Sequence, residues 1–384
     1  MRITIIIYAL REGMNTMKAK QMLLLIALLL PTLAVAEDDL SALPGKADAL
    51  HQLSRPKVKL VSQITGEDSP NKTLSRFRVW GTDLGSMAEM NGKVYMFGGD
   101  TFASANSDDW RSNVLFIIED DDPSDGLTIT DAITDKWGRA KELLYSAKKD
   151  YSQMTVIPTN LFAVDNTLYC VYMSVSHWGE AGRWDCTHSG LAISEDGGET
   201  WSRPETLQWP GDSNFIQTAN CRVGDTMYLW GIPSGRQGGV ALMKCPVDRL
   251  TDMGAYSYYV GCDEAGQPQW VQGQDGIRQA KTVIPGPCGE ISVMYNEYLG
   301  NFVITYLNER KHAIVMREGV TPWGEWSQEY VLAGASDYPA LYGAFMLNRY
   351  QEGNTFYFAM SQYFPIYNIM WMQAELNIKT ESKE

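Results

Sequence analysis

The sequence predicts an all-β fold, a five-bladed β-propeller, from a repeated hairpin, the strand that follows each hairpin, and a shortage of helical segments. In each copy a short turn precedes an apolar residue and then an aromatic or β-branched residue that opens an alternating strand. The copies end 54 to 75 residues apart, which is longer than most solenoid repeats and suits a four-stranded sheet with its loops. They are Asn91–Tyr95, Asp165–Tyr169, Gly224–Tyr228, Leu299–Val303 and Gly353–Tyr357.

A strand of small residues precedes each hairpin, and a strongly apolar strand follows it. Three strands and a weaker outer strand make one blade, and closing the blades into a ring protects their edges from other chains. We expect a short helix at residues 136–149, and we expect Val58 to Ile64 to close the ring. The apolar strands begin at Asn113, Gly190, Gly239, Ala313 and Asn368.

Residues 193–201 match the Asp-box pattern Ser-x-Asp-x-Gly-x-Thr-Trp, which marks one propeller hairpin. In this turn the carboxylate of Asp196 accepts backbone N–H bonds, Gly198 permits a positive φ, and Trp201 packs between blades. Such hairpins lie on the face away from the usual ligand site. We therefore predict a structural role for Asp196, and residues 321–327 look like a degenerate counterpart.

The first 36 residues have the features of a secretory signal peptide. Basic residues precede an apolar run, Met22 to Leu33, that is too short to span a bilayer, and an Ala-x-Ala sequence ends at Ala36. We expect translation to start at Met17 and cleavage after Ala36. No cysteine follows the apolar run, so we expect a periplasmic or extracellular protein without a lipid anchor.

The chain is acidic, with 32 Lys and Arg against 46 Asp and Glu and a net charge of −14. Without the leader the net charge becomes about −17, which opposes nucleic-acid binding and favours a neutral substrate. We expect a flexible segment at 37–56, a single propeller domain at 57–378 and a tail at 379–384, and a monomer that does not insert stably into membranes.

Six cysteines lie in the predicted mature chain. An even number in an exported protein permits disulfides in 15 connectivities, and free buried thiols are the alternative. No C-x-x-C pair occurs and the four histidines are scattered, so the sequence predicts neither a zinc site nor a redox motif, and no cofactor. The cysteines are Cys170, Cys186, Cys221, Cys245, Cys262 and Cys288.

Two aspartates flank the first hairpin. If Asn91-Gly92 forms a two-residue turn, cross-strand partners have numbers that sum to 183, and Asp83 lies opposite Asp100. Like charges at such positions destabilise a sheet, and glycoside hydrolysis is one reason to keep two carboxyls together. A solvated loop pair is the alternative, and a bulge at Gly98-Gly99 would turn Asp100 to the other face.

Candidate sugar ligands lie at the starts of inner strands and in loops of the same face, because inner strands converge on a central channel. For Arg111 the alternative is an ion pair with Asp108 or Asp109; for His188 it is an ordinary loop histidine. Packing between blades competes with sugar stacking for the two aromatic loop residues. The candidates are Asn160, Gln217, Ser292 and Tyr342 on strands, and Arg111, Trp178, His188, Arg236 and Tyr367 in loops.

Several segments together resemble one family, the domain of unknown function 4185. They are GTDLG, FGGDTF, WRSN at 110–113, the Asp box, IPSGR at 232–236, YNEYLGNFV at 295–303, and residues 361–368. The resemblance runs from about residue 78 to 376. Some members are assigned to glycoside hydrolase family 183, endo-acting enzymes that cleave α-D-arabinofuranose linkages in arabinan. The resemblance implies a five-bladed propeller with Asp83 and Asp100 as the catalytic pair.

The sequence thus leads to one hypothesis and three alternatives. The hypothesis is a secreted endo-acting glycosidase in which one aspartic acid protonates the leaving oxygen and the other carboxylate attacks the sugar or activates water. A non-catalytic glycan-binding propeller is the first alternative. A sialidase is a weaker one, since it needs an arginine cluster and a tyrosine nucleophile. A purely structural interaction propeller is the third.

Overall fold

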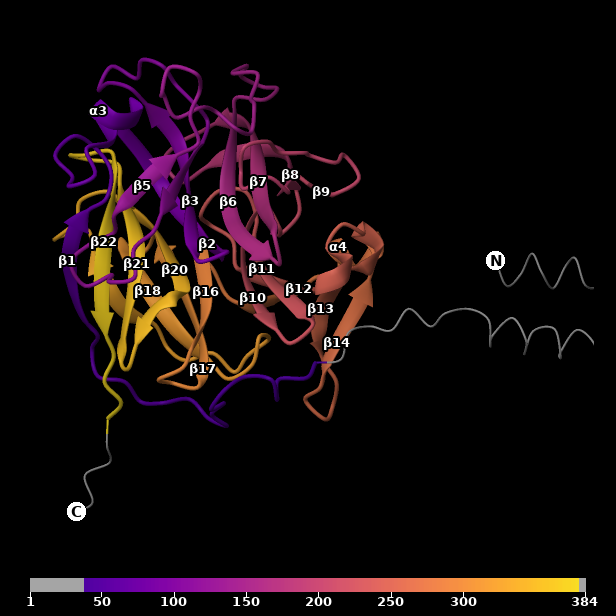
Figure 1. Cartoon of the computed structure of the whole chain (residues 1–384). Coiled ribbons are helices and arrows are strands. Elements are labelled where there is room, and N and C mark those ends of the chain that lie inside the picture. Colours follow the sequence, from indigo (N-terminus) through magenta and orange to yellow (C-terminus); the bar gives the residue numbers. More distant parts are fainter. Residues whose placement is uncertain (1–37, 380–384) are drawn as a thin grey trace, which may run out of the picture. The chain divides into compact units, whose positions relative to one another are not determined.

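The computed structural model describes residues 38–379, and this part of the chain forms five β-sheets around a common centre (Figure 1). The innermost strands of the sheets contact one another in the cyclic order β2, β6, β10, β16, β20 and back to β2. A closed cycle of inner strands defines a propeller, so the predicted all-β, five-bladed fold is confirmed. Helix is limited to short turns in these residues. They are α3 (Thr73–Phe77), α4 (Gln274–Ile277), η1 (Val247–Arg249) and η2 (Met253–Ala255).

The blades follow one another along the chain. Blade one contains β2 (Gly81–Met90), β3 (Lys93–Phe102), β4 (Val114–Ile118) and β5 (Ile129–Ala132). Blade two contains β6 (Thr155–Val164), β7 (Thr167–Trp178), β8 (Trp184–Ser194) and β9 (Gln208–Pro210). Blade three contains β10 (Gln217–Val223), β11 (Thr226–Ile232), β12 (Val240–Pro246), β13 (Ser257–Cys262), β14 (Pro268–Gln272) and β15 (Thr282–Ile284).

The last two blades complete the ring. Blade four contains β16 (Gly289–Asn296), β17 (Asn301–Asn308), β18 (Ala313–Gly319) and β19 (Tyr330–Gly334). Blade five contains β20 (Leu341–Glu352), β21 (Thr355–Gln362), β22 (Asn368–Glu375) and β1 (Lys57–Gln63). Because β1 pairs with β22, the two ends of the domain share one sheet, as predicted for the strand that closes the ring.

The five predicted hairpins join the two innermost strands of the five blades. Asn91 and Gly92 have φ values of 53° and 76°, which two-residue turns of this kind require. Asp165, Gly224, Gly300 and Gly353 also have positive φ in the corresponding turns. All five turns lie at the same end of the inner strands, and we call this the hairpin end. The opposite end, where inner strands begin, is the entry end.

The turn at residues 194–201 lies at the hairpin end and is closed by its own side chains. Asp196 accepts hydrogen bonds from Thr200 N at 3.0 Å, from the Thr200 hydroxyl at 2.6 Å and from the Ser194 hydroxyl at 2.9 Å. The indole of Trp201 donates to Gly198 O at 3.0 Å, and its ring packs 5.2 Å from Phe97 of blade one. The turn therefore helps to join blades one and two.

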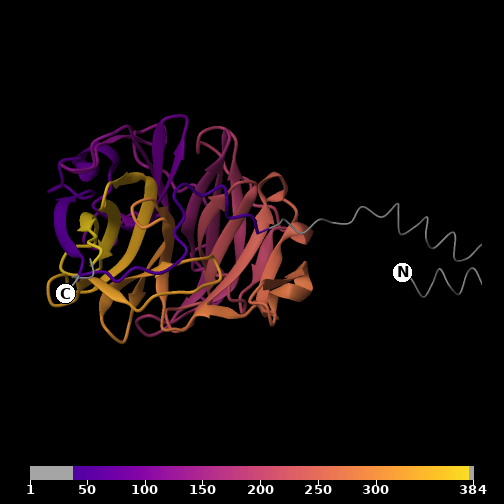
Figure 2. The same cartoon turned by 90° about the horizontal axis from the view of Figure 1, so that it is seen from below.

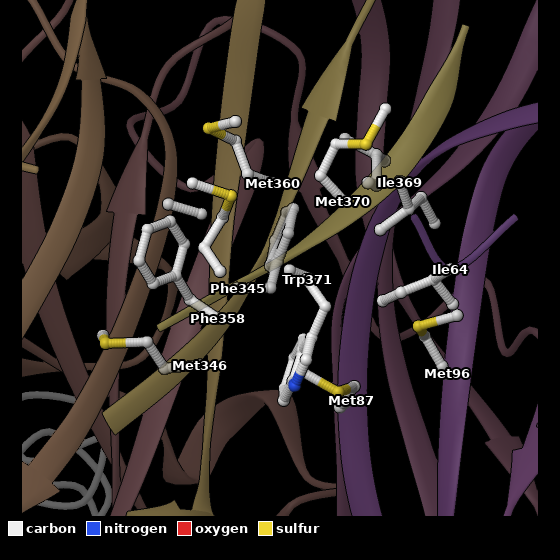
Figure 3. Packing of buried hydrophobic residues seen from close by; sticks show 14 of the residues in the cluster. Ile64, Met87, Met96, Phe345, Met346, Phe358, Met360, Ile369, Met370 and Trp371 are labelled. Carbon is white, nitrogen blue, oxygen red and sulfur yellow. The ribbon is translucent and has the colours of Figure 1, made fainter. Parts of the chain in front are cut away.

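Methionine and aromatic side chains fill the space between blades one and five. Met87 and Met96 of blade one and Met360 and Trp371 of blade five belong to one buried cluster (Figure 3). Flexible thioethers fill irregular gaps between twisted sheets, which suits an interface between neighbouring blades. This packing fixes blade one, whose inner hairpin carries the aspartate pair, against blade five.

The segment 38–56, which we predicted to be flexible, lies along blades three and four in this structure (Figure 2). Asp38 accepts hydrogen bonds from Tyr228, Lys244 and Trp270 at 2.7–2.8 Å. His51 Nδ1 lies 2.6 Å from Oε1 of the buried Glu318. These polar contacts attach the segment to the sheets.

Two further expectations can be compared with the described residues. The helix predicted at 136–149 is wrong: the segment consists of turns and short bridges, because its backbone bonds to other loops, as where Lys141 N donates to Ile133 O. All six cysteines are free thiols, and five of them are buried or half-buried, which matches the second of the two readings left open. The predicted signal peptide lies outside the described residues. Within residues 38–379 no helix is long and apolar enough to cross a membrane.

Candidate active site

Two compensating bulges shape the strands that carry the aspartate pair. The residue numbers of cross-strand partners sum to 183, as predicted, from the Asn91-Gly92 turn to the pair Ser86↔Phe97. The same sum is found again at the pair Thr82↔Thr101. Between them Leu84 pairs with Gly98, so each strand contains one extra residue. Asp83 and Asp100 therefore lie side by side within one irregular step rather than in the directly opposed pair that we predicted.

The backbone around Asp83 is held in an unusual conformation. Leu84 has a φ of 65°, a left-handed value that costs a non-glycine residue on the order of 1 kcal/mol or more. The Leu84 N–H donates to the Ser361 hydroxyl of blade five at 2.7 Å, which fixes this bulge. A side chain on Gly99 would place its Cβ 2.3 Å from Asp83 Oδ1. The Asp83 carboxylate thus rests on the bare backbone of Gly99, next to Asp100.

Asp100 accepts hydrogen bonds from two side chains. The Trp110 indole donates to Asp100 Oδ1 at 2.7 Å, and the Thr155 hydroxyl donates to the same oxygen at 2.8 Å. The ammonium group of Lys148 lies over the Trp110 ring, 4.6 Å from its centre. Burial raises the pKa of Asp100 to about 6, although both hydrogen bonds and the charge of Lys148 lower it.

Asp83 has fewer stabilising contacts. The Tyr342 hydroxyl donates to Asp83 Oδ2 at 2.8 Å, whereas Oδ1 is buried without a hydrogen-bond partner among the described residues. Burial, and then the negative charge of Asp100, raise the pKa of Asp83 to about 7, although the hydrogen bond from Tyr342 and the nearby Tyr367 hydroxyl lower it. An acceptor oxygen without a donor favours the protonated form of Asp83.

Asp83 and Asp100 are half-buried as whole residues, although the Oδ1 atom of Asp83 is itself buried. Their environments differ in one respect that matters for chemistry: Asp100 has donors that stabilise its charge, and Asp83 has one donor and a charged neighbour. When two neighbouring carboxyl groups have different pKa values, the one with the higher pKa can act as the acid and the other as the base or nucleophile. The site is therefore equipped for general acid–base chemistry near neutral pH.

Arg236 packs on the Tyr342 ring and is itself held by Glu290. The guanidinium of Arg236 lies 4.9 Å from the centre of the Tyr342 ring and donates to Glu290 Oε1 at 2.8 Å. Glu290 is 5 % exposed, has a φ of 30°, and burial raises its pKa. The Oε2 atom of Glu290 is buried and has no partner in the described part of the chain, and the charge of Glu290 adds to the raised pKa of Asp83.

Of the nine predicted sugar ligands, three reach the aspartate pair or its immediate partners. Tyr342 bonds to Asp83, Arg236 packs on Tyr342, and the Tyr367 hydroxyl donates to Asp100 O at 3.0 Å. Trp178 is 37 % exposed at the end of β7 and packs 5.5 Å from Trp184. These residues come from blades two, three and five, which the propeller brings to the entry end.

The other predicted ligands have structural contacts. The guanidinium of Arg111 is buried and donates to Ala140 O at 2.7 Å and Arg78 O at 2.6 Å; its distance to the Asp109 carboxylate is 3.9 Å. Gln217 donates to Gly235 O at 3.0 Å. The ring of His188 packs edge-on 5.9 Å from Tyr172. None of these contacts involves Asp83 or Asp100.

Asn160 and Ser292 were expected to begin inner strands, and this expectation is wrong. They lie within β6 and β16 and line a cavity of about 270 Å³ between the inner strands. The Ser292 hydroxyl accepts from Met346 N at 2.9 Å, and Asn160 Nδ2 lies 3.4 Å from the Thr218 hydroxyl. The residue that begins β6 is Thr155, which bonds to Asp100.

Sequence reasoning missed four residues around the pair. Thr155, Lys148 and Glu290 are distant in the chain and reach the site through the ring, so no local pattern identifies them. Trp110 is different, since it begins the WRSN segment that carries the family resemblance. An indole ten residues after a catalytic candidate, in the loop that leaves the same strand, was a usable signal.

Taken together, the fold and the site define a class: a five-bladed propeller with a partly buried pair of carboxyl groups at the entry end of its first blade. The chain belongs to the family described as domain of unknown function (DUF4185), whose sequence profile matches residues 68–373. The resemblance found in the sequence is thereby confirmed. A search of curated proteins with the sequence gave no match.

Solved structures of similar fold include two with clear overlap. A Bacteroides ovatus protein with a provisional hydrolase description is 11 % identical, with a TM-score of 0.55, over 78 % of this chain and 86 % of that one. An exo-β-1,3-galactanase from Phanerochaete chrysosporium is 10 % identical, with a TM-score of 0.51, over 84 % of this chain and 67 % of that one. At such low identity these likenesses show a shared fold.

Proposed function

We propose that this protein is a glycoside hydrolase that cleaves within D-arabinofuranose-containing polysaccharide, with Asp83 as general acid and Asp100 as nucleophile or base. The observation that carries the proposal is the unequal treatment of two adjacent carboxyls. Asp100 accepts two hydrogen bonds on Oδ1, whereas Asp83 Oδ1 accepts none from the described residues. Two carboxyl groups flanking a glycosidic bond are what this reaction needs.

The roles follow from the protonation states. Above about pH 6 Asp100 is ionised and can attack the anomeric carbon or activate water, while Asp83 keeps its proton up to about pH 7 and can give it to the leaving oxygen. The Tyr342 hydroxyl orients the Asp83 carboxyl. The family resemblance supports the arabinofuranose substrate, and the propeller hydrolases of similar fold support carbohydrate chemistry.

The first experiment is to incubate the purified chain with a panel of furanose and pyranose polysaccharides and to separate the products by size. Release of short oligosaccharides from arabinan supports the proposal and its endo mode. Binding to a glycan without any cleavage over a long incubation would instead favour the glycan-binding alternative. Export of the protein, also part of the proposal, is tested by sequencing the N-terminus of the protein recovered outside the cytoplasm.

The second experiment assigns the two roles. An aryl arabinofuranoside has a leaving group that departs without a proton, so Asp83→Asn should lose activity on polysaccharide but keep much of its activity on the aryl substrate. Asp100→Asn should lose both activities. If Asp100→Asn is the variant that keeps the aryl activity, the roles are reversed; if both variants keep full activity on arabinan, the pair is not catalytic.

A further inference from the structure

Exposed apolar side chains cluster in one loop at the entry end. Among the described residues nine large hydrophobic side chains are exposed, and three of them, Tyr363, Phe364 and Ile366, lie in the loop between β21 and β22. Tyr363 is 71 % exposed and Phe364 is 64 % exposed. Exposed apolar side chains that gather in one segment are a feature of interaction surfaces, whereas singly scattered ones need no explanation.

This loop connects to Asp100 through a series of rings. Tyr363 packs edge-on 6.1 Å from Tyr367, and Tyr367 lies 5.7 Å from Phe102. Phe102 in turn stacks 6.5 Å from Trp110, the residue whose indole donates to Asp100. We call this series the Tyr363 arm, and it is formed by blades five and one.

A second series of contacts leads from another exposed aromatic to Asp83. Trp178, at the end of β7, packs edge-on 5.5 Å from Trp184, and the Arg236 guanidinium lies 5.7 Å from the Trp184 ring. The same guanidinium covers Tyr342, which donates to Asp83. We call this series the Trp178 arm. Its outer residues come from blades two and three, whereas the Tyr363 arm is formed by blades five and one.

We infer that the Tyr363 arm and the Trp178 arm are sugar-binding subsites on the two sides of the bond to be cleaved, so that the interior of a polysaccharide chain lies across the carboxyl pair. Sugar rings present a face of C–H groups that packs on the negative face of an aromatic ring. One arm ends on the proposed nucleophile and the other on the proposed acid, which are the groups that act on opposite sides of the scissile bond. This inference rests on the proposed function and deepens it by assigning the residues that hold the polysaccharide on each side of the cleaved bond.

The test compares three variants of the full chain by affinity electrophoresis in gels that contain arabinan. The variants are the double substitution Tyr363→Ala with Phe364→Ala, the substitution Trp178→Ala, and the control Tyr298→Ala. Tyr298 is 37 % exposed, as Trp178 is, and lies in the turn between β16 and β17 at the hairpin end. We expect each arm variant to lose about tenfold or more in affinity, because a stacked aromatic contributes that much to binding, and the control to match the parent chain.

Hydrolysis gives a second readout. The ratio of kcat/KM for arabinan to kcat/KM for a short aryl arabinofuranoside should fall about 10- to 100-fold in each arm variant, and products should shift in length. An active enzyme whose ratio and affinity are unchanged in both arm variants overturns the inference and leaves the proposed function standing. If arabinan retards the parent chain more than the arm variants, but no hydrolysis occurs, the subsites are supported and the proposed catalytic function is wrong. Absence of binding by the parent chain to every polysaccharide tested overturns both.

Discussion

Asp196 at the hairpin end and Asp83 at the entry end are the same residue type in opposite circumstances. Asp196 accepts three hydrogen bonds within its own turn, whereas Asp83 has one donor and a buried oxygen without any partner among the described residues. Slight burial acts to raise the pKa of Asp196, but its hydrogen bonds outweigh it and hold the pKa below the usual value. The pKa of Asp83 is raised to about 7.

The contrast extends to the backbone of the two ends. Asn91, Gly92, Gly224 and Gly353 suit positive φ at the hairpin end, so the turns there are formed by residues that accept this conformation easily. At the entry end Leu84 and Glu290 have positive φ without being suited to it. Among residues 38–379, the unpaired acidic oxygens and the positive φ of Leu84 and Glu290 thus occur together at the entry end, as the proposed division between a chemical end and a structural end requires.

The largest expected effect separates the two ends by activity. Asp100→Asn should lower the rate of polysaccharide hydrolysis about 10²- to 10⁴-fold, because a neutral amide can neither attack the sugar nor accept a proton from water. Asp196→Ala should leave that rate within about twofold, since its bonds are confined to its own turn. Initial rates on arabinan for folded variants check both. Equal losses in the two variants would contradict the division between the ends.

A glycine substitution should have the next largest effect. Gly99→Ala places a Cβ 2.3 Å from Asp83 Oδ1, so the carboxyl must move, and we expect kcat to fall about 10- to 100-fold through misplacement of the acid. Gly334→Ala is the matched control, because its Cβ would meet nothing closer than 3.7 Å. Steady-state kinetics of the two variants are the measurement. An unchanged kcat in Gly99→Ala would show that the position of Asp83 is not critical.

How much of this contrast the sequence predicts depends on how local its causes are. The five hairpins and the turn around Asp196 were predicted, because each depends on residues adjacent in the chain. The closing strand was also predicted, although its pairing with β22 joins the two ends of the domain. The predicted register of the first hairpin placed the aspartates directly opposite each other, with a bulge at Gly98-Gly99 as the alternative. The pair of compensating bulges was not predicted, since Ser361 of blade five holds one of them.

The surroundings of the pair were predicted less well for the same reason. Thr155 and Glu290 reach the aspartates only because five blades close into a ring, and the sequence distance to Asp83 exceeds 70 residues for both. Arg111 had a plausible role as a loop arginine, yet it bonds to two backbone carbonyls. The segment 136–149 was expected to be helical and is instead held by tertiary hydrogen bonds.

Stability should respond in opposite directions at the two ends. A carboxyl with a raised folded-state pKa binds more protons in the folded state, so the free energy of unfolding falls as pH rises from about 4 to about 7. Asp83→Asn removes the titrating group and with it this fall in the free energy of unfolding. The variant should therefore be more stable than the parent chain by about 1–3 kcal/mol at pH 8, with little difference near pH 4.

The pKa of Asp196 is lowered, so its contribution to stability is present above about pH 4 and is lost on further acidification. Asp196→Ala should therefore destabilise the protein at pH 8, by about 1–2 kcal/mol given its exposure. Urea denaturation of both variants at pH 4 and pH 8 gives the four values needed. Destabilisation by Asp83→Asn at pH 8 would mean that Asp83 is an ordinary structural carboxylate.

The smallest expected effect concerns the pH dependence of the reaction. Activity should fall below about pH 6 as Asp100 gains a proton, and above about pH 7 as Asp83 loses one. The Tyr342 hydroxyl lowers the pKa of Asp83 by donating to its ionised form, so Tyr342→Phe should move the alkaline limb of the kcat/KM profile upward by about half to one pH unit. Tyr306→Phe, which removes a buried hydroxyl bonded to Glu329 in blade four, should leave that limb in place. A downward shift of that limb in Tyr342→Phe would mean that the Tyr342 hydroxyl stabilises protonated Asp83. The hydroxyl would then raise the pKa of Asp83, together with burial and the charge of Asp100, instead of lowering it.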